Sequence, residues 1–387
     1  MDLFYVDLHI HIGRTASGKP VKITGAKSLT FSNIIHHARD EKGLNMIGII
    51  DSHSPEVMEE MEMLIANGQM EELAEGGLVY GDMSIILGSE LEIYDESCQG
   101  PIHVLCYLPT LSKMKKFSHW LSQHMKNIQL SSQRVYISGK ELQLKTKELE
   151  GLFIPAHVFT PFKSLYGKGV KKTLEEVFVP DLIDGIELGL SADTLMADSV
   201  NELHRYPYLS NSDAHSLGKI AREYQTIQME KPTFHELKLA LLEREGRGVA
   251  ANYGLDPLLG KYHQTTCANC LKRFEESELR CSNCGGMKKV KGVASRIMEL
   301  KNEMGQVRTR PPYIHQVPLD FIPGLGPKLL QRLLNHFGTE MAVLHEVPFE
   351  KMKEVIPEKV AQLIMKARIG QLNLAAGGGG KYGKVTE

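Results

Sequence analysis

Seven short apolar runs alternate with longer amphipathic segments over about the first 250 residues of this 387-residue chain. The runs lie at residues 4–10, 46–52, 84–93, 101–108, 152–158, 184–190 and 208–215. Helical periodicity between them is clearest at residues 31–42, 55–72, 117–129 and 234–245. This alternation predicts repeated βα units around a mostly parallel sheet. Polar residues stand where the runs end, and the ends of barrel strands meet on one rim, so we predict a distorted α/β barrel of seven units.

The composition is that of a soluble globular protein, with 42% hydrophobic and 24% charged residues. The N-terminus lacks a basic start followed by a long apolar run, and no stretch of about 18 apolar residues occurs, so we expect a cytoplasmic protein without a membrane span. In a reducing compartment the six cysteines favour metal ligands or buried thiols over disulfides. Cys98 and Cys106, which stand apart, are expected to be buried.

Histidines and carboxylates gather at the ends of the predicted strands. The candidate metal ligands are His9, His11, Asp51, His53, Glu90, His103, His157, Asp213 and His215. Residues two apart on a strand point to the same side, so His9 and His11 can reach one ion, and the pairs at 51/53 and 213/215 can do the same. A single histidine is usually a core or surface residue, but three such pairs at strand ends indicate metal binding. Mixed imidazole and carboxylate ligands suit zinc, manganese or iron, and magnesium is a further candidate.

These motifs resemble those of the polymerase and histidinol phosphatase (PHP) superfamily of metallophosphoesterases over roughly residues 1–250. The resemblance implies a first ion held by His9, His11, Glu90 and Asp213, and a second held by Glu90, His103 and His157. A third ion would take His215 and a histidine after the second strand. At that position the chain has Asp51-Ser52-His53, so the choice between Asp51 and His53 stays open.

The loop after His11 lacks the histidine that often completes a third site, which leaves the count at two or three divalent ions. Arg14 or Lys19 in this loop either brings positive charge to a phosphate or is an ordinary solvated side chain. Glu187 ends another strand and either orients a ligand or faces the ions.

Two ions about 3.5 to 4 Å apart suit phosphodiester hydrolysis, because one activates water while both neutralise charge on the phosphoryl oxygens. Glu90 can bridge them. His157, His215 or Asp51 would pass a proton to the leaving oxygen, and the sequence does not choose among the three. The predicted catalytic residues are therefore Glu90, His157, Asp213, His215 and Asp51.

A second metal site follows the barrel segment. Cys267, Cys270, Cys281 and Cys284 form two C-x-x-C pairs, which predicts a closed, structural zinc site of ribbon type. A basic stretch comes directly afterwards, and its charges are suited to DNA phosphates. We expect DNA contacts from Lys288 and Lys289, with Lys291, Arg296, Lys301, Arg308 and Arg310 in the same stretch.

Residues 321–338 resemble the helix-hairpin-helix family of DNA-backbone binders. Gly324 and Gly326 allow a tight turn and a close approach to phosphate, with Lys328 and Arg332 nearby. A degenerate second copy at residues 347–368 lacks the glycines and is expected to pack against the first.

The order of barrel, four-cysteine ribbon and hairpin resembles the endonuclease Q family of DNA-repair enzymes. This resemblance implies cleavage of DNA on the 5′ side of deaminated bases (uracil, hypoxanthine, xanthine) or abasic sites. We divide the chain into a barrel at 1–255, a ribbon with the basic segment at 256–316, a hairpin module at 317–370 and a flexible tail at 371–387. The alternatives are a small-molecule PHP phosphatase, of histidinol-phosphate or nucleotide type, and a DNA-binding scaffold without catalysis.

Two smaller hypotheses complete the sequence analysis. Tyr80, Phe159 or Tyr166 either lines a pocket for an extruded base or lies in the core. Residues 370–377 resemble the peptide by which bacterial repair proteins bind the sliding clamp, with Gln371, Leu372 and Leu374 as anchors, or are simply the end of the last helix. A DNA-repair role also implies association with the nucleoid.

Overall fold

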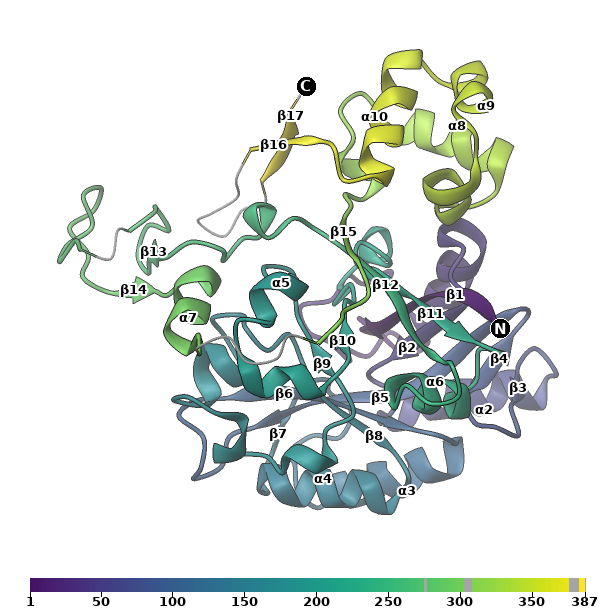
Figure 1. The fold of residues 1–387 in the computed structure, drawn as a ribbon. Helices are drawn as coiled ribbons and strands as arrows, with labels where there is room; N and C mark the ends of the chain where they lie inside the picture. Colours follow the sequence, from purple (N-terminus) through teal and green to yellow (C-terminus); the bar gives the residue numbers. More distant parts are fainter. Residues whose placement is uncertain (275–276, 303–307, 376–382, 387) are drawn as a thin grey trace.

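The computed structural model describes residues 1–274, 277–302, 308–375 and 383–386 (Figure 1). Each of the seven apolar runs contains a strand, and we call these seven strands the seven-strand core. They are β1 Asp2–Ile10, β2 Met46–Ile49, β5 Met83–Ile93, β6 Ile102–Leu108, β8 Leu152–Pro155, β9 Ile186–Glu187 and β10 Tyr208–Leu209.

The strand pairing is parallel in one half of the core and antiparallel in the other. Strand β1 pairs with β2, and β2 with β5, in parallel, whereas β5 with β6 and β6 with β8 are antiparallel. Residues 94–101, between β5 and β6, are too few for the crossover that a parallel pair needs. The core therefore departs from a regular series of βα units at this point.

Backbone hydrogen bonds continue from β8 around to β1. The Val158 amide donates to the Glu187 carbonyl at 3.0 Å, β9 and β10 form a parallel pair, and Ile10 bridges Ala214 in parallel. Asp7 and the segment after β10 are joined as well, since the Ser212 and Ala221 amides both donate to its carboxylate. The first and last strands of the core thus lie side by side, and their polar ends share one rim.

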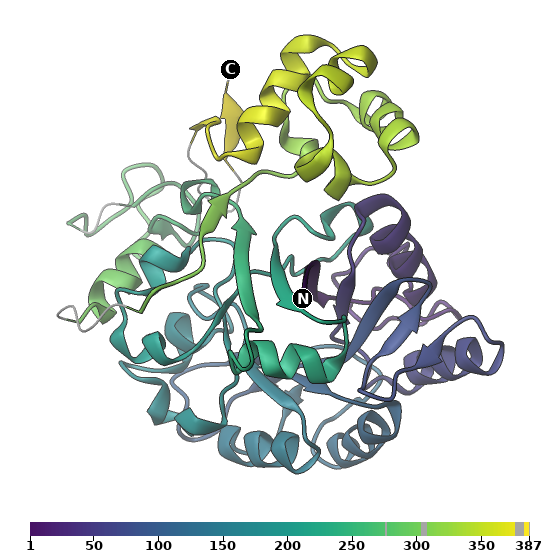
Figure 2. The same cartoon turned by 45° about the vertical axis from the view of Figure 1, so that its right-hand side comes forward.

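Helices cover the outside of the core (Figure 2). Their bounds are α1 Phe31–His36 with a π-helical turn at His37–Lys42, α2 Pro55–Ala66, α3 Leu111–Ser122, α4 Gly139–Glu148, α5 Thr194–Ala197 and α6 Phe234–Leu241. The helix predicted at 117–129 begins earlier because the Thr110 side chain accepts a hydrogen bond from the Lys113 amide and caps the helix there. The helix predicted at 55–72 ends at Ala66.

Further strands extend the sheet on both sides of the core. Strands β11 Tyr224–Met229 and β12 Gly248–Gly254 add antiparallel beyond β1, and β15 Tyr313–His315 pairs parallel with β12. On the other side lie β3 Glu71–Glu72, β4 Leu78–Tyr80 and β7 Arg134–Val135. The sequence patterns did not predict β11, β12 or β15, which carry the chain from the core to its C-terminal third.

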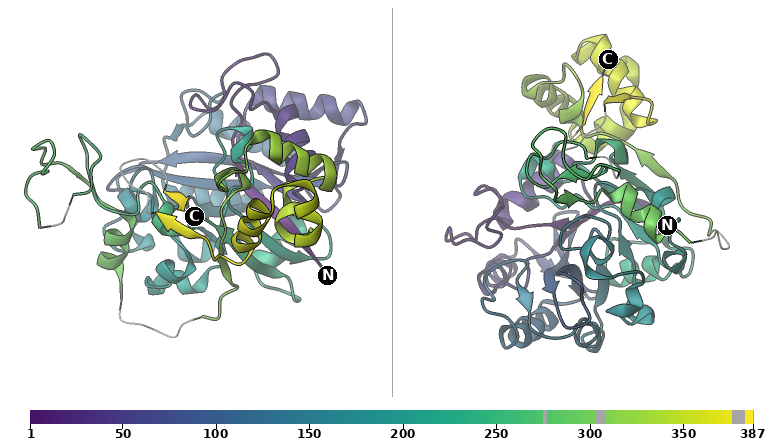
Figure 3. Two further views of the ribbon diagram at one scale, coloured as in Figure 1. Left: turned by 90° about the horizontal axis from the view of Figure 1, so that it is seen from above. Right: turned by 90° about the vertical axis from the view of Figure 1, so that its left-hand side faces the viewer.

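The C-terminal third forms two projections (Figures 1 and 3). One holds the cysteine segment, with β13 Thr266–Cys267, β14 Lys289–Val290 and α7 Val293–Leu300. The other is the helical hairpin module, which stands above the core. It contains α8 Pro327–Phe337, a π-helical turn at Ala342–Glu346, α9 Phe349–Val355 and α10 Glu358–Arg368.

The end of the chain is paired rather than extended freely. Strands β16 Asn373–Ala375 and β17 Lys384–Thr386 form an antiparallel pair, and the Gly383 amide donates to Leu259. This pairing differs from the flexible tail predicted from residue 371, whose four glycines lie outside the described residues. Among the described residues, no helix combines the length and the apolar character needed to cross a bilayer.

The hairpin module is fixed to the core by buried contacts. The ammonium of Lys42 pairs with Glu340 at 2.9 Å. The imidazole of His345 stacks on Tyr5 at a centroid distance of 4.9 Å and also contacts the rings of Tyr224 and Tyr253. These contacts set the position of the module relative to the rim of the core.

Candidate metal centre

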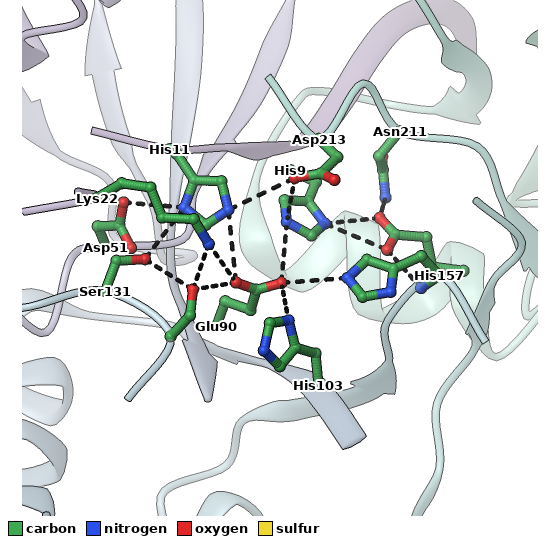
Figure 4. Close-up of polar contacts among 12 residues, drawn as sticks. His9, His11, Lys22, Asp51, Glu90, His103, Ser131, His157, Asn211 and Asp213 are labelled. Atoms are coloured by element: carbon green, nitrogen blue, oxygen red, sulfur yellow. Dashed lines mark hydrogen bonds and ion pairs between the residues drawn. The ribbon is translucent and has the colours of Figure 1, made fainter. Parts of the chain in front are cut away.

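The predicted ligands converge at the rim of the core (Figure 4). His9 lies on β1 and His11 just after it, Glu90 lies on β5 and His103 on β6, while His157 and Asp213 lie in the segments that follow β8 and β10. Because β6 is antiparallel to β5, His103 reaches this rim from the start of its strand rather than from its end. His157 and Asp213 have φ values of 32° and 45°, a conformation that non-glycine residues keep mainly where the surroundings enforce it.

The side chains of four residues bring their ligand atoms close together. The Nε2 atoms of His9 and His11 each lie 3.5 Å from Asp213 Oδ1, and they lie 3.6 and 3.5 Å from the two Glu90 oxygens. Metal–ligand bonds of about 2.0–2.2 Å give tetrahedral ligand–ligand distances of about 3.3–3.6 Å. The residues present therefore fit an ion held by His9, His11, Glu90 and Asp213.

The other nitrogen of each of these histidines is bound to a buried carboxylate. His9 Nδ1 lies 2.9 Å from Glu187, and His11 Nδ1 lies 3.1 Å from Asp51. The Nε2 atoms of both rings are buried and have no hydrogen-bond partner among the described residues. Glu187 and Asp51 therefore fix the ring orientation that points each Nε2 at the ion site.

A second ligand group shares Glu90. His103 Nδ1 lies 2.9 Å and His157 Nε2 lies 3.3 Å from Glu90 Oε1. His103 Nε2 is buried and also without a hydrogen-bond partner among the described residues. A carboxylate between two histidine sets is suited to bridging neighbouring ions.

A third group consists of His11, Asp213 and His215. His215 Nε2 lies 3.3 Å from Asp213, and its Nδ1 lies 3.1 Å from the Thr24 hydroxyl. His53 belongs to none of the ligand groups found among the described residues, since its Nε2 faces the Leu130 carbonyl at 3.5 Å. Asp51 Oδ2 is engaged by His11 and by the Ile12 amide at 2.7 Å.

Lys22 supplies a cation that the sequence analysis did not identify. Its ammonium lies 3.0 Å from Glu90 Oε2 and donates to Ser132, and its side chain is 13% exposed (Figure 4). The two cations considered from sequence lie elsewhere: Lys19 pairs with Glu56, and Arg14 donates to the Gly13 carbonyl. Arg14, Lys19 and Lys22 all lie in the loop after His11. The sequence could therefore indicate that this loop brings a cation to the ligands, but not which of its basic residues does so.

The electrostatics of the centre show a surplus of buried negative charge. Burial lowers the pKa of His9, but Glu187 and Asp213 outweigh it and raise that pKa to about 10. Burial likewise opposes ionisation of Glu90, yet His103 and Lys22 hold its pKa well below the usual range. A divalent ion would balance this negative charge, in competition with the proton on His9.

A pocket of about 390 Å³ opens beside the ligands. Its wall includes His157, Asp213 and His215, together with Thr160 and Tyr262 and the cations Lys219, Arg222 and Lys261. The aromatic residues considered from sequence lie outside it. Phe159 and Tyr166 are fully buried and stack on each other at 5.3 Å, and Tyr80 binds His36 through its hydroxyl. Phe159 and Tyr166 are therefore core residues.

The four predicted zinc cysteines lie together. Cys267 Sγ is 3.5 Å from Cys284 Sγ, and Cys270 Sγ is 3.6 Å from Cys281 Sγ. Zn–S bonds of about 2.3 Å place thiolates about 3.8 Å apart in a tetrahedral site. The segment's own apolar cluster contains little more than Phe274 and cysteines, so a zinc ion would supply most of its stability.

The residues predicted to bind DNA are exposed, apart from those of the basic stretch that hold the fold. Gly324 has a φ of 81°, Gly326 is the N-cap of α8, and both glycines, Lys328 and Arg332 are exposed, as are Lys288 and Lys289. Arg308 and Arg310 instead bind Glu243 and Asp198 of the core segment. Cys98 and Cys106 are buried, as predicted.

Comparison with known proteins gives one relative that is matched over its whole length. The uncharacterized protein YqxK of Bacillus subtilis (strain 168) is 56% identical over 385 residues and is matched over 100% of both chains. No protein-family model matches the sequence.

Two solved structures match over almost the whole chain. The lesion-specific endonuclease PfuEndoQ from Pyrococcus furiosus has a TM-score of 0.84 and 34% identity, over 99% of this chain and 95% of its own. Endonuclease Q in complex with a 27-mer duplex substrate that has an abasic lesion at the active site has a TM-score of 0.84 and 33% identity, over 99% and 96%. The chain therefore belongs to the endonuclease Q family.

Proposed function

We propose that this protein is a DNA-repair endonuclease that hydrolyses the phosphodiester 5′ to a deaminated base (uracil, hypoxanthine or xanthine) or an abasic site. The observation that carries the proposal is that the Nε2 atoms of His9 and His11 each lie 3.5–3.6 Å from a Glu90 oxygen and from Asp213 Oδ1. The full-length correspondence to a lesion-specific endonuclease supports it. We interpret the seven-strand core as a distorted PHP-type barrel.

His9, His11, Glu90 and Asp213 would hold one divalent ion, and Glu90, His103 and His157 a second; such ions would supply activation of water and neutralisation of charge on the phosphoryl oxygens. Glu90 holds both ligand groups together, and Glu187 and Asp51 orient His9 and His11. Of the three candidates for proton transfer to the leaving oxygen, His157 and His215 are favoured because they line the pocket. Asp51 is fully buried and engaged by His11 and Ile12.

The pocket beside the ligands is the proposed site for the extruded lesion. Its volume of about 390 Å³ is within the range of about 300–1,000 Å³ of small-molecule sites. Deaminated bases pair weakly, so extruding them costs less than extruding a normal base. Tyr262 offers a ring to the extruded nucleotide, and Lys219, Arg222 and Lys261 offer charge to its phosphates.

The C-terminal projections are proposed to hold duplex DNA. Gly324, Gly326, Lys328 and Arg332 would contact phosphates at the hairpin, and Lys288 and Lys289 would do so beside the ribbon. Sliding-clamp binding through Gln371, Leu372 and Leu374 remains a prediction. It requires β16 to leave β17, because Leu374 is paired with Val385. Unchanged clamp affinity after removal of residues 371–387 would exclude it.

The test uses end-labelled duplexes with a single uracil, hypoxanthine or abasic site, incubated with Mg²⁺, Mn²⁺ or Zn²⁺. We expect one cut 5′ to the lesion and no cut in the undamaged duplex. Glu90→Gln and Asp213→Asn should abolish cutting while leaving DNA affinity largely intact. Release of phosphate from a simple monoester without DNA cleavage would favour the phosphatase alternative. A single zinc ion per chain would favour the alternative of a DNA-binding protein without catalytic activity.

A further inference from the structure

A groove of about 560 Å³ lies between a loop of the core and the segment that follows the cysteines. Lys168 and Lys171 line it from the core side, and Lys289, Lys291 and Arg296 line it from the other side. Among the described residues that line this groove, none is acidic. The whole chain carries 47 acidic and 45 basic residues, so this concentration of positive charge is a local feature.

Arg296 fixes the shape of the groove. Its guanidinium donates to the backbone carbonyls of Tyr166, Val170 and Lys171 at 2.7, 3.0 and 2.7 Å. Helix α7 is thereby tied to the loop that carries the two core lysines. On the opposite wall, the ammonium of Lys289 lies 4.4 Å from the ring centroid of Phe274. Lys291 and Arg296 also pair with Glu299. The tie between α7 and the loop therefore holds the two walls of the groove in a fixed arrangement.

The groove is connected to the metal centre through one loop and one pair of rings. The loop begins at the ligand His157 and continues through Phe162 to Lys168 and Lys171. Phe162 packs edge-to-face against Tyr262 at 5.5 Å, and Tyr262 lines the pocket beside the ligands. In Figure 1 the cysteine segment projects to the left of the core and the hairpin module stands at its upper right. The groove thus leads away from the pocket toward the cysteine segment.

We propose that this groove binds the phosphodiester backbone of the DNA arm that leaves the metal centre on the side of the cysteine segment. The inference rests on the proposed function and assigns to Lys168 and Lys171 contacts with that arm. Arg296 is engaged by backbone carbonyls and Glu299, and Lys291 also pairs with Glu299. The lysines on the two chain segments match a row of phosphates better than a single small anion. The hairpin module would bind the other arm of the duplex, so the lesion would lie between two DNA-binding regions of the protein.

The test compares Lys168→Gln/Lys171→Gln with Lys113→Gln/Lys238→Gln, which removes the same charge from a hollow that also contains Glu75 and Glu150. All four lysines are exposed or partly exposed, so both variants should fold. Affinity for a duplex with one abasic analogue is measured over a KCl series by fluorescence anisotropy. The groove variant should bind this duplex roughly tenfold or more weakly than the wild type. The slope of log affinity against log KCl concentration should also become shallower by about one unit per lysine removed. The control should match the wild type.

Duplexes shortened to a few base pairs on one side of the lesion locate the contact. Shortening the arm that occupies the groove should weaken wild-type binding and remove the difference between wild type and groove variant. Equal affinity and equal salt dependence of wild type and groove variant on the long duplex would overturn the proposal that the groove binds DNA. An equal loss of affinity in the control variant would overturn it as well. Wild-type cleavage of the same duplex is scored separately. If the groove substitutions weaken DNA binding but the wild type does not cleave the duplex, the proposed function is overturned and the proposal that the groove binds DNA still stands.

Discussion

A neutral histidine has one nitrogen that donates and one that accepts, and a buried carboxylate decides which is which. Glu187 and Asp51 each engage an Nδ1 atom, which leaves the Nε2 atoms of His9 and His11 as the proposed ligands. Glu187 is held in turn by the side chain of Asn211 and the amide of His157, both at 2.8 Å. At the scale of single residues, the metal centre therefore depends on groups that do not touch the ions.

Glu187→Gln tests this dependence. The amide keeps the size of the side chain but can present its NH₂ group to His9, which disturbs the orientation of the ring. We expect metal affinity of the core to fall by about 10- to 100-fold, measured by competition with a chromophoric chelator. Glu202→Gln, which alters a half-buried acid bound to Tyr166, is the control and should keep wild-type affinity. Equal affinity in the two variants would contradict the role assigned to Glu187.

Lys22 is expected to stabilise negative charge at the reacting phosphate, because its ammonium is held beside Glu90 inside the centre. Removal of one such donor typically lowers the catalytic rate by about 10²–10³-fold. Lys22→Met should show a loss of that order in single-turnover cleavage, and Lys22→Arg should retain part of the rate. Metal content measured by elemental analysis should not fall in either variant. A parallel loss of metal and activity would instead give Lys22 a purely structural role.

At the scale of elements, the sequence predicted the seven strands of the core because apolar runs and polar strand ends are local patterns. It did not predict the antiparallel placement of β6 and β8, which follows from the short connection after β5. Strand β11 was missed because it pairs with β1 across more than 200 residues, and β12 extends the sheet from β11. Lys22 was missed for a similar reason, since its position beside Glu90 depends on how a loop folds back over the rim.

The cysteine segment should depend on its zinc while the core does not. Cys281→Ser removes one of four thiolates from a segment whose apolar cluster is very small, so the segment should lose its folded structure. We expect one zinc fewer per chain, weaker DNA binding and an unchanged melting transition of the core. Elemental analysis and differential scanning calorimetry measure these effects. Cys106→Ser, a change at a buried cysteine outside the ribbon, should keep the zinc content of the wild type.

At the scale of the whole molecule, one buried acid where strands β11 and β12 meet β15 makes stability depend on pH. Burial raises the pKa of Glu223 from 4.5 to about 8, and the single hydrogen bond from Leu255 only partly opposes this. Between these two pH values the folded chain holds a proton that the unfolded chain has released. The stabilisation is complete below about pH 4.5 and is lost as the pH rises to about 8.

Glu223→Gln should remove this pH dependence, because the amide cannot ionise. Wild type and variant should have similar free energies of unfolding near pH 5, and the variant should gain on the wild type by a few kcal/mol on approaching pH 8. Urea unfolding at several pH values measures the difference. A difference that stays constant over this range would mean that the carboxyl group is already ionised in the folded chain.

The bridge between Ile10 and Ala214, with the antiparallel pairing of Asp2 to Met229, has a consequence for biosynthesis. His9 and His11 leave the ribosome about two hundred residues before Asp213, which is proposed to share their ion. A nascent chain therefore exposes a His-x-His sequence that cannot yet form the complete site, and contacts of such long range form late in folding. Selection of the correct cation should accordingly occur after synthesis of the core, when all four ligands can act together.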